Sequence, residues 1–267
     1  MNHLQVADYI TGWLKEKLLE SGQKGFVVGV SGGIDSALVS TLCARTGYPT
    51  IVLSMPIHQP KDQFNRANEQ VAFLEAHFPN VKSFLVDLTE SYETIKKALP
   101  EEGRAELALV NTRSRLRMLT LYSVANSYCH LVAGTGNKIE DYGIGFFTKY
   151  GDGGVDISPI GDLVKSEVYA IAGKLGVPES ILRARPTDGL WETDRTDEEQ
   201  IGATYDELEW AMQYCDSEGI ENPELLKSLQ ELDIRQLEVL DIYLSRHIAN
   251  AHKMQMPPVC ELEVLRG

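Results

Sequence analysis

The stretch Gly29-Val30-Ser31-Gly32-Gly33-Ile34-Asp35-Ser36 decides how the chain around it folds. The apolar residues 26–28 before it predict a buried strand, and residues 37–42 after it predict a helix. Adjacent glycines let backbone N–H groups approach an anion closely, and the beginning of a helix adds free N–H groups and partial positive charge. Strand, turn and helix together therefore predict a phosphate-binding loop.

A carboxylate inside this loop distinguishes it from the Walker type. No Gly-Lys-Ser/Thr follows at the Walker spacing, whereas Asp35 stands in the turn, where its carboxylate suits a magnesium ion that bridges to phosphates. The pattern Ser-Gly-Gly-x-Asp-Ser resembles the ATP loop of the pyrophosphatase type, whose members cleave ATP between the α and β phosphates. The alternative is an ordinary glycine turn that Ser36 caps.

Length and composition indicate one large α/β domain over residues 1–267. The formal net charge of −14 argues against a nucleic-acid partner, because phosphate backbones are bound by clustered Lys and Arg. Residues 1–17 lack the apolar core of a signal peptide and no apolar run reaches membrane-spanning length, so we expect a cytoplasmic protein that contacts no membrane. The scattered cysteines predict reduced thiols that mostly fill the core, and no zinc site: Cys43, Cys129, Cys215 and Cys260.

Strand-like and helix-like segments alternate through the first 160 residues. Further strands are predicted at 50–55, 81–88, 131–133 and 155–160, and helices at 3–20, 62–77 and 105–128. This order implies right-handed crossovers and an open five-stranded parallel sheet with helices on both faces, a Rossmann-like α/β fold. Nucleotides bind such sheets beyond the carboxyl ends of the strands, where the phosphate loop stands.

The predicted helix at 105–128 carries three arginines, Arg113, Arg115 and Arg117. Arg113 and Arg117 share a face at i,i+4, where like charges repel unless an anion or an acidic group lies between them. Arg115 points to roughly the opposite side. Spacing alone leaves open which arginine is functional and which forms a surface salt bridge.

A second loop resembles the first, because small residues and a hydroxyl again follow a predicted strand. It is Gly134-Thr135-Gly136-Asn137-Lys138-Ile139-Glu140. Glu140 is a candidate second ligand for magnesium beside Asp35, since Mg²⁺ takes few carboxylates and keeps several waters. The Gly-rich stretch 145–156, with aromatic residues beside lysine and aspartate, suits a flat, charged ligand. Its two phenylalanines are equally compatible with a place in the core.

Six segments occur in one order along nearly the whole chain, from the first helix to about residue 257, and together they resemble the NAD synthetases. They are SGGIDS (31–36), NTRSRLRM (111–118), GTGNKIE (134–140), GFFTKYGDGGVD (145–156), PTDGLWE (186–192) and AHK (251–253). The resemblance implies a fold like that of the adenine nucleotide α-hydrolases. It also implies ATP-dependent amidation of nicotinic acid adenine dinucleotide (deamido-NAD) to NAD, with AMP and pyrophosphate as the other products and an acyl-adenylate between.

The resemblance assigns roles to individual residues. It implies an ATP site made by Gly29, Val30, Ser31, Gly32, Gly33, Ile34, Asp35, Ser36, Thr135, Lys165 and Thr187. It implies a dinucleotide site made by Arg115, Lys149, Asp156, His252 and Lys253, and a magnesium site made by Asp35 and Glu140. The catalytic residues would be Asp35, Lys165 and Asp156. Lysine is a suitable point charge for phosphate, so Lys165 would replace the missing Walker lysine. For Asp156, contact with the ligand and orientation of ammonia both stay open.

The resemblance also implies a homodimer. It implies free ammonia as the nitrogen donor, because the chain is too short to include a glutaminase domain. A separate glutaminase subunit stays open as a source of ammonia. Two other functions are compatible with the loop: another AMP-forming amidoligase that carries it, and a regulator that binds ATP without turnover. The regulator would not need Asp35, Glu140 and Lys165 together.

Two further segments carry expectations. Residues 185–199 are polar and contain a proline and a glycine, which favours a lid over ATP, with an ordinary surface loop as the alternative. Residues 251–267 form a C-terminal arm that begins at the predicted ligand-binding pair His252 and Lys253. Met254 follows that pair where family members often carry a basic residue, and the tail from residue 257 has no assigned role.

Overall fold

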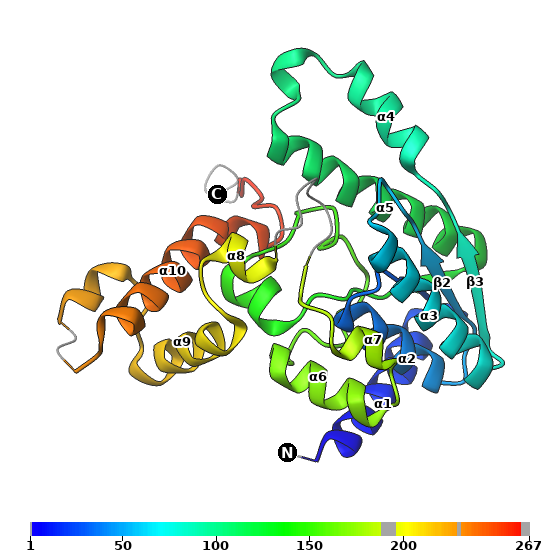
Figure 1. The fold of residues 1–267 in the computed structure, drawn as a ribbon, viewed down its shortest axis with the longest axis horizontal. Coiled ribbons are helices and arrows are strands. Elements are labelled where there is room, and N and C mark those ends of the chain that lie inside the picture. Colours follow the sequence, from blue (N-terminus) through cyan, green and yellow to red (C-terminus); the bar gives the residue numbers. More distant parts are fainter. Residues whose placement is uncertain (1, 188–195, 229–230, 263–267) are drawn as a thin grey trace.

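A four-stranded parallel sheet lies at the centre of the larger lobe (Figure 1). The computed structural model describes residues 2–187, 196–228 and 231–262. The strands are β1 (Gly25–Gly29), β2 (Thr50–Ser54), β3 (Val81–Leu85) and β4 (His130–Val132), in the order β3-β2-β1-β4. β2 and β3 follow β1 on one side of it, and β4 pairs with β1 on the opposite side. The predicted parallel α/β fold is therefore confirmed, with its switch point between β1 and β4.

Alternate side chains of the central strand face two different helix layers. Phe26 and Val28 pack in a cluster with α1, α2 and α6, whereas Val27 packs in a cluster with α5. This two-residue period is what a strand buried on both faces requires. The helices of these layers, together with α3 beside α2, are α1 (His3–Ser21), α2 (Ile34–Arg45), α3 (Lys61–His77), α5 (Glu106–Tyr128) and α6 (Lys165–Lys174).

The predicted fifth strand at 155–160 is wrong. In the described chain this segment makes one parallel bridge, between Ala133 and Ile157, and no strand. The carboxylate of Asp156 accepts a hydrogen bond from the backbone N–H of Val132 (2.8 Å), which a backbone carbonyl would accept in a regular ladder. Pro159 then removes a backbone donor. Side-chain capping and proline together limit the pairing to one residue.

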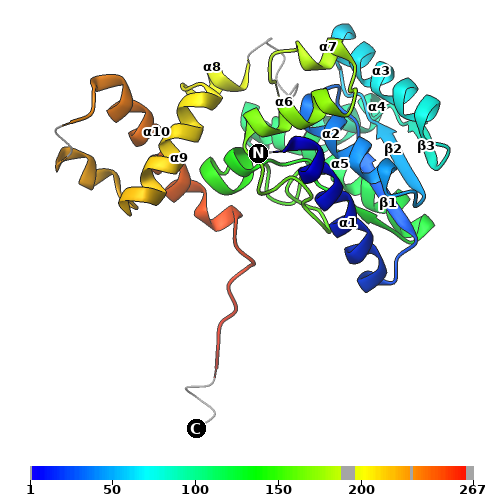
Figure 2. The same cartoon turned by 90° about the horizontal axis from the view of Figure 1, so that it is seen from below.

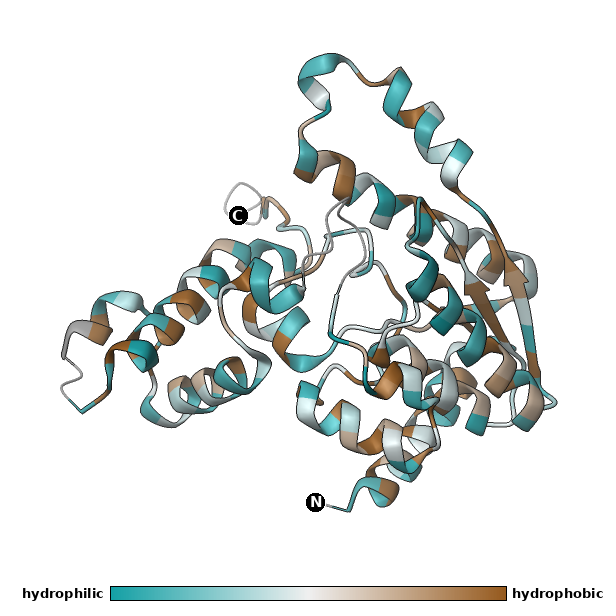
Figure 3. Ribbon diagram, in the orientation of Figure 1, coloured by the Kyte–Doolittle hydropathy of each residue, from teal (hydrophilic) through white to brown (hydrophobic). Residues whose placement is uncertain are grey.

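Helices after residue 196 form a second lobe beside the sheet (Figure 1). Figure 3 shows hydrophobic residues on the inward faces of these helices and along the strands. The lobe has its own apolar cluster, which also takes in Ile139 and Ile144 from the π-helix η2 (Lys138–Ile144). Its elements are α8 (Asp197–Ile201), α9 (Tyr205–Glu218), the 3-10 helix η3 (Pro223–Ser228) and α10 (Ile234–Asn250).

The remaining described helices are short. They are α4 (Thr89–Ala98), α7 (Glu179–Leu182) and the 3-10 helices η1 (Glu101–Gly103) and η4 (Ala251–Lys253). After η4 the described part of the tail runs away from α10 as an exposed strand-like chain without pairing (Figure 2). Within the described ranges, no helix is long and apolar enough to cross a membrane. All four cysteines are free, and only Cys43 and Cys215 are buried, so the expected core role holds for two of them.

The beginning of α9 supplies a test of how the second lobe is stabilised. Glu207 closes a capping box with Thr204 and pairs with Arg235 of α10 at 2.8 Å. The hydrogen bond from Arg235, followed by those from Thr204, lowers the pKa of Glu207 from 4.5 to about 2 despite some burial. A lowered pKa in the folded state adds stability above pH 4.5, and that stability is lost as the pH falls through 4.5 towards 2.

We expect Glu207→Gln to lower the midpoint of thermal unfolding at pH 7 by about 2 °C, because Gln keeps the cap but loses the ion pair. The difference from wild type should shrink below pH 4.5 and vanish near pH 2. Calorimetry at several pH values measures it. A difference of constant size down to pH 2 would show that the ionised carboxylate does not supply this stability.

Candidate active site

The first loop is a tight turn that requires glycine at one position. Gly32 has a φ of +86°, and an added Cβ would lie 2.5 Å from the carbonyl oxygen of Gln63 on α3. The hydroxyls of Ser31 and Ser36 lie 3.1 Å apart, and the Ser36 hydroxyl donates to the carbonyl of Gly33 (2.9 Å). The loop therefore wraps closely against α3 and leads straight into the N-terminus of α2.

The second loop, which follows β4, joins the first through Asn137. This fully buried side chain donates to Asp35 Oδ1 (3.1 Å) and accepts from the backbone N–H of Glu140 (3.1 Å). Asn137 is also the N-cap of η2, the element that carries Glu140. One amide therefore fixes the two predicted metal ligands relative to each other, although they stand more than one hundred residues apart in the chain.

Lys165 lies between the two carboxylates. Its ammonium is 2.6 Å from Asp35 Oδ2 and 2.9 Å from Glu140 Oε1, and the residue is only 3% exposed. Burial disfavours the charged ammonium, but the two carboxylates offset this and raise the pKa of Lys165 above its usual 10.5. For Glu140, burial is likewise outweighed by Lys165 and by a hydrogen bond from Tyr205, which leaves its pKa below 4.5. For Asp35 burial outweighs the attraction of Lys165 and raises the pKa of the carboxyl group above 3.8. Lys165 therefore stays charged at neutral pH beside the ionised carboxylate of Glu140.

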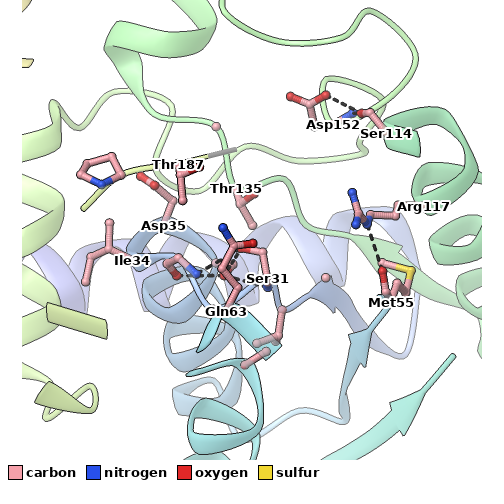
Figure 4. Close-up of a pocket in the computed structure, with 18 of the residues that line it drawn as sticks. Ser31, Ile34, Asp35, Met55, Gln63, Ser114, Arg117, Thr135, Asp152 and Thr187 are labelled. Atoms are coloured by element: carbon pink, nitrogen blue, oxygen red, sulfur yellow. Dashed lines mark hydrogen bonds between the residues drawn. The ribbon is translucent and has the colours of Figure 1, made fainter. Parts of the chain in front are cut away.

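The three charged residues of this cluster line a cavity, and Figure 4 shows Asp35 with other residues that line it. Asp35, Thr135 and Thr187 lie at one end of it, and Arg117 lies at the other beside the carbonyl of Met55. The structure thus brings together every residue predicted for ATP and for metal. These are Gly29, Val30, Ser31, Gly32, Gly33, Ile34, Asp35, Ser36, Thr135, Glu140, Lys165 and Thr187.

The three arginines of α5 have three different environments. Arg113 is buried, with its guanidinium 4.9 Å from the ring centroid of Tyr92. Arg115 is exposed and lies beside the backbone carbonyl of Lys149. Arg117 lines the cavity and donates to the carbonyl of Met55 (3.0 Å). The spacing places Arg113 and Arg117 on one face, and the structure gives them different partners: the ring of Tyr92 of α4 lies over Arg113, whereas Arg117 bonds to Met55.

The residues predicted for the dinucleotide lie outside this cavity. Lys149 donates to the backbone carbonyls of His252 and Gln255, and Lys253 donates to those of Gly145 and Phe147. Together with Arg115 they form one basic patch of the surface: Arg115, Lys149, His252 and Lys253. Asp156 is not among them, because its carboxylate is held by the hydroxyl of Tyr122 (3.0 Å) and the N–H of Val132.

Several residues around the cavity were missed by reasoning from the sequence. Tyr205 donates to Glu140, and Asn137 stands within a quoted motif without having been singled out. Asp141 and Asp152 line the cavity as well, and burial raises the pKa of the Asp141 carboxyl group. Burial also raises the pKa of Tyr205 well above 10, so its phenol stays protonated. Asn137 and Asp152 could have been found from their places in GTGNKIE and GFFTKYGDGGVD; no local pattern marks Tyr205.

The residues at the cavity fit a magnesium ion. Two carboxylates already converge on one cation, the ammonium of Lys165, and both face the space where phosphates would lie. No group of three or more His, Cys, Asp or Glu side chains suited to a metal occurs in the described chain. Magnesium is commonly held by one or two carboxylates plus substrate phosphates, so a pair of ligands suffices.

The expected lid at 185–199 is only partly described. Thr187 and Pro186 line the cavity, and the carbonyl of Pro186 accepts from the backbone N–H of Asp197 (3.1 Å). Asp197 begins α8, so the end of the predicted polar loop is helical. Residues 188–195 lie outside the described residues, and the lid stays a prediction.

The glycine loop lies at the switch point of a parallel sheet, carries an aspartate and lacks the Walker lysine. These features define the class of α/β nucleotide-binding proteins with a pyrophosphatase-type loop. A family model described as NAD synthase matches residues 6–257. The chain therefore belongs to the NAD synthase family.

Individual relatives agree with this assignment. The NH(3)-dependent NAD(+) synthetase of Methanococcoides burtonii is 39% identical over 269 residues, which cover 100% of this chain and 98% of the relative. The solved NH3-dependent NAD synthetase of Campylobacter jejuni has a TM-score of 0.76 at 28% identity, with 98% of this chain and 100% of that one covered. An NMN synthetase from Francisella tularensis has a TM-score of 0.81 at 29% identity, with 97% and 99% covered.

Proposed function

We propose that the protein is an ATP-dependent ligase that amidates deamido-NAD with free ammonia, yielding NAD, AMP and pyrophosphate. The observation that carries the proposal is the cluster of Asp35, Glu140 and Lys165 at the floor of a cavity walled by the phosphate loop. Relatives named NH(3)-dependent NAD(+) synthetases match this chain over nearly its full length. These matches do not favour another amidoligase or a regulator without turnover.

The reaction needs no nucleophile from the protein. The nicotinate carboxylate attacks the α phosphorus of ATP, and pyrophosphate leaves as the acyl-adenylate forms. Ammonia then attacks the acyl carbon and loses a proton, the bond from that carbon to the phosphate oxygen breaks, and AMP leaves. The protein contributes position and charge: backbone N–H groups of the loop hold the phosphates, and Lys165 lies where negative charge increases as the α–β bond breaks.

Asp35 and Glu140 would hold Mg²⁺. When bound, the ion neutralises charge on the phosphates of ATP. Lys165 already donates to both carboxylates, so it keeps them oriented towards the cavity before any ligand arrives. A buried ammonium between two carboxylates also removes the repulsion that two unpaired buried charges would cause.

The basic patch of Arg115, Lys149, His252 and Lys253 would bind the dinucleotide, and Asp156 would serve as a further contact or orient ammonia. We also propose that the protein is a cytoplasmic homodimer. The patch supports a site at a subunit boundary, because Arg115 and His252 are exposed and the patch lies apart from the ATP cavity in one chain. Light scattering of the purified protein measures the oligomeric state, and a monomer at assay concentration would contradict the dimer.

Replacing Arg115 tests the assignment of the substrate patch. We expect Arg115→Ala to raise the KM for deamido-NAD about tenfold, because one charged hydrogen bond is lost, while the KM for ATP stays within about twofold. Steady-state kinetics with each substrate varied separately measures this. Arg183→Ala is the matched control, because Arg183 is 80% exposed and pairs with Glu179 one turn away. An equal rise in both KM values would place Arg115 in the ATP site instead.

The direct test of the reaction measures pyrophosphate and NAD together. Purified protein is incubated with ATP, Mg²⁺ and ammonium, with and without deamido-NAD, and then with glutamine in place of ammonium. We expect equal amounts of NAD and pyrophosphate with ammonium, and little product with glutamine. Nicotinic acid mononucleotide is the comparison substrate, because one structural relative is an NMN synthetase. Faster turnover of the mononucleotide would replace the proposed substrate.

A further inference from the structure

One side chain of the helical lobe reaches the charged cluster of the ATP site. Tyr205 is the first residue of α9, is only 5% exposed and packs in the apolar cluster of that lobe. Its hydroxyl donates to Glu140 Oε1 at 2.5 Å, and its ring centroid lies 4.6 Å from the ammonium of Lys165. The same residue therefore contacts a predicted metal ligand through its oxygen and the central lysine through its ring.

These two contacts differ in what they stabilise. The hydroxyl supports the carboxylate of Glu140, which accepts on the same oxygen from Lys165. The ring faces the ammonium of Lys165, an arrangement in which the negative face of the aromatic system favours the cation. Removal of the hydroxyl thus takes a hydrogen bond from Glu140, and a longer one from Asp197, but keeps the ring beside Lys165. Removal of the ring alters the support of Lys165 as well.

The surroundings of Tyr205 hold it in this place. Its backbone N–H donates to Glu198 Oε1 of α8 (3.1 Å), and Thr204 caps the helix that Tyr205 begins. The hydroxyl also lies 3.3 Å from Asp197 Oδ2, a second carboxylate from α8. A buried side chain fixed by a cap, a backbone bond and a packed core is rigid enough to orient a neighbour.

We propose that Tyr205 is a positioning residue of the ATP site, which holds Glu140 in the orientation that binds the metal of Mg·ATP and holds Lys165 above its ring. The helical lobe then contributes to nucleotide binding through this side chain. Partners that orient a metal ligand commonly contribute tenfold to one hundredfold in metal affinity. The inference rests on the proposed function in taking Mg·ATP as the ligand.

Three variants separate the two contacts from general packing. Tyr205→Phe removes the hydroxyl, Tyr205→Leu removes the ring as well, and Tyr243→Phe is the matched control. Tyr243 is a buried tyrosine of the same cluster on α10, stacked on His247. The probe is α,β-methylene-ATP, whose α–β bond is not cleaved, titrated calorimetrically with Mg²⁺ and again with EDTA. Turnover is then measured over a range of Mg²⁺ concentrations.

We expect Tyr205→Phe to bind the Mg²⁺ complex of the analogue about tenfold more weakly and the metal-free analogue as wild type does. Its half-saturating Mg²⁺ concentration should rise about tenfold, while kcat at saturating Mg²⁺ stays within about twofold. Tyr205→Leu should also weaken metal-free binding. A merely structural role would lower the melting temperature and the active fraction without moving the half-saturating Mg²⁺ concentration. We expect both quantities to stay at the wild-type level in Tyr243→Phe. If the affinity for the Mg²⁺ complex and the half-saturating Mg²⁺ concentration of Tyr205→Phe also lie within twofold of wild type, the proposal is overturned.

A double variant keeps the test independent of folding. In Glu140→Gln, loss of the Tyr205 hydroxyl should have little further effect on Mg²⁺ dependence, because the two side chains act together. Full additivity of the two changes would overturn the proposal. Binding of the analogue does not require amidation, so wild-type protein that binds it without making NAD would contradict the proposed function and leave this inference standing.

Discussion

Lys165→Met is expected to lower turnover by about one hundredfold or more, since it removes a charge that stabilises the transferring phosphates. The same change leaves the carboxylates of Asp35 and Glu140, whose side chains are 17% and 16% exposed, beside each other without their shared cation. Breaking a buried ion pair by removal of one partner costs about 3–5 kcal/mol, so the free energy of unfolding should fall by that order. Steady-state kinetics and chemical unfolding without nucleotide measure the two effects.

Magnesium should partly restore the stability of this variant. A divalent cation can take the place between the two carboxylates, so added Mg²⁺ should raise the melting temperature of Lys165→Met more than that of wild type. Lys17→Met is the control, because Lys17 forms an exposed pair with Glu20 on α1. Wild-type turnover in Lys165→Met, or equal responses of both proteins to Mg²⁺, would contradict the role assigned to the lysine.

Gly32→Ala is expected to remove ATP binding and to destabilise the fold. The position has a φ of +86°, and the new Cβ would lie 2.5 Å from the carbonyl oxygen of Gln63 and 3.0 Å from the nitrogen of Ala67. Both neighbours are backbone atoms of α3 and cannot rotate away. Left-handed strain and overpacking together amount to about 3 kcal/mol, and the displaced loop should raise the dissociation constant for ATP at least about one hundredfold.

The matched control for this change is Gly47→Ala. Gly47 has a similar φ of +78°, but nothing lies within 4 Å of an added Cβ. It should therefore lose about 1 kcal/mol of stability from strain alone and keep its affinity for ATP. Calorimetric titration with ATP and thermal unfolding measure both variants. Equal affinity in Gly32→Ala and Gly47→Ala would show that close packing of the loop on α3 is not needed for binding.

The fold was predicted well where local pattern and topology agree. The strand–turn–helix at residues 26–42 and the helix predicted at 105–128 follow from apolar runs and helical spacing, and the structure confirms them as β1, α2 and α5. The prediction for 155–160 was wrong because a side-chain carboxylate, that of Asp156, took the place of a ladder carbonyl. A sequence pattern records apolar residues and cannot record which atom accepts a given N–H.

The ATP site was predicted more completely than the site for the dinucleotide. Two loops that end neighbouring parallel strands must meet at one edge of the sheet, so Asp35 and Glu140 could be paired from topology. Arg117 and Tyr205 could not be placed in this way. Arg117 is held by hydrogen bonds to Met55 and Gln59, which follow β2, and Tyr205 belongs to a helix that packs in the separate core of the second lobe. Such contacts come from tertiary packing, which leaves no local periodic signal.

The charged cluster joins two lobes that each have their own core. Asp35 and Lys165 stand on helices packed against the sheet, whereas Glu140 stands on η2, whose Ile139 and Ile144 belong to the core of the helical lobe. A slight parting of the lobes would pull these charges apart while every helix stayed intact. On warming, we therefore expect activity to be lost before the helical circular dichroism signal, because the contact between the two lobes can open while each core stays folded.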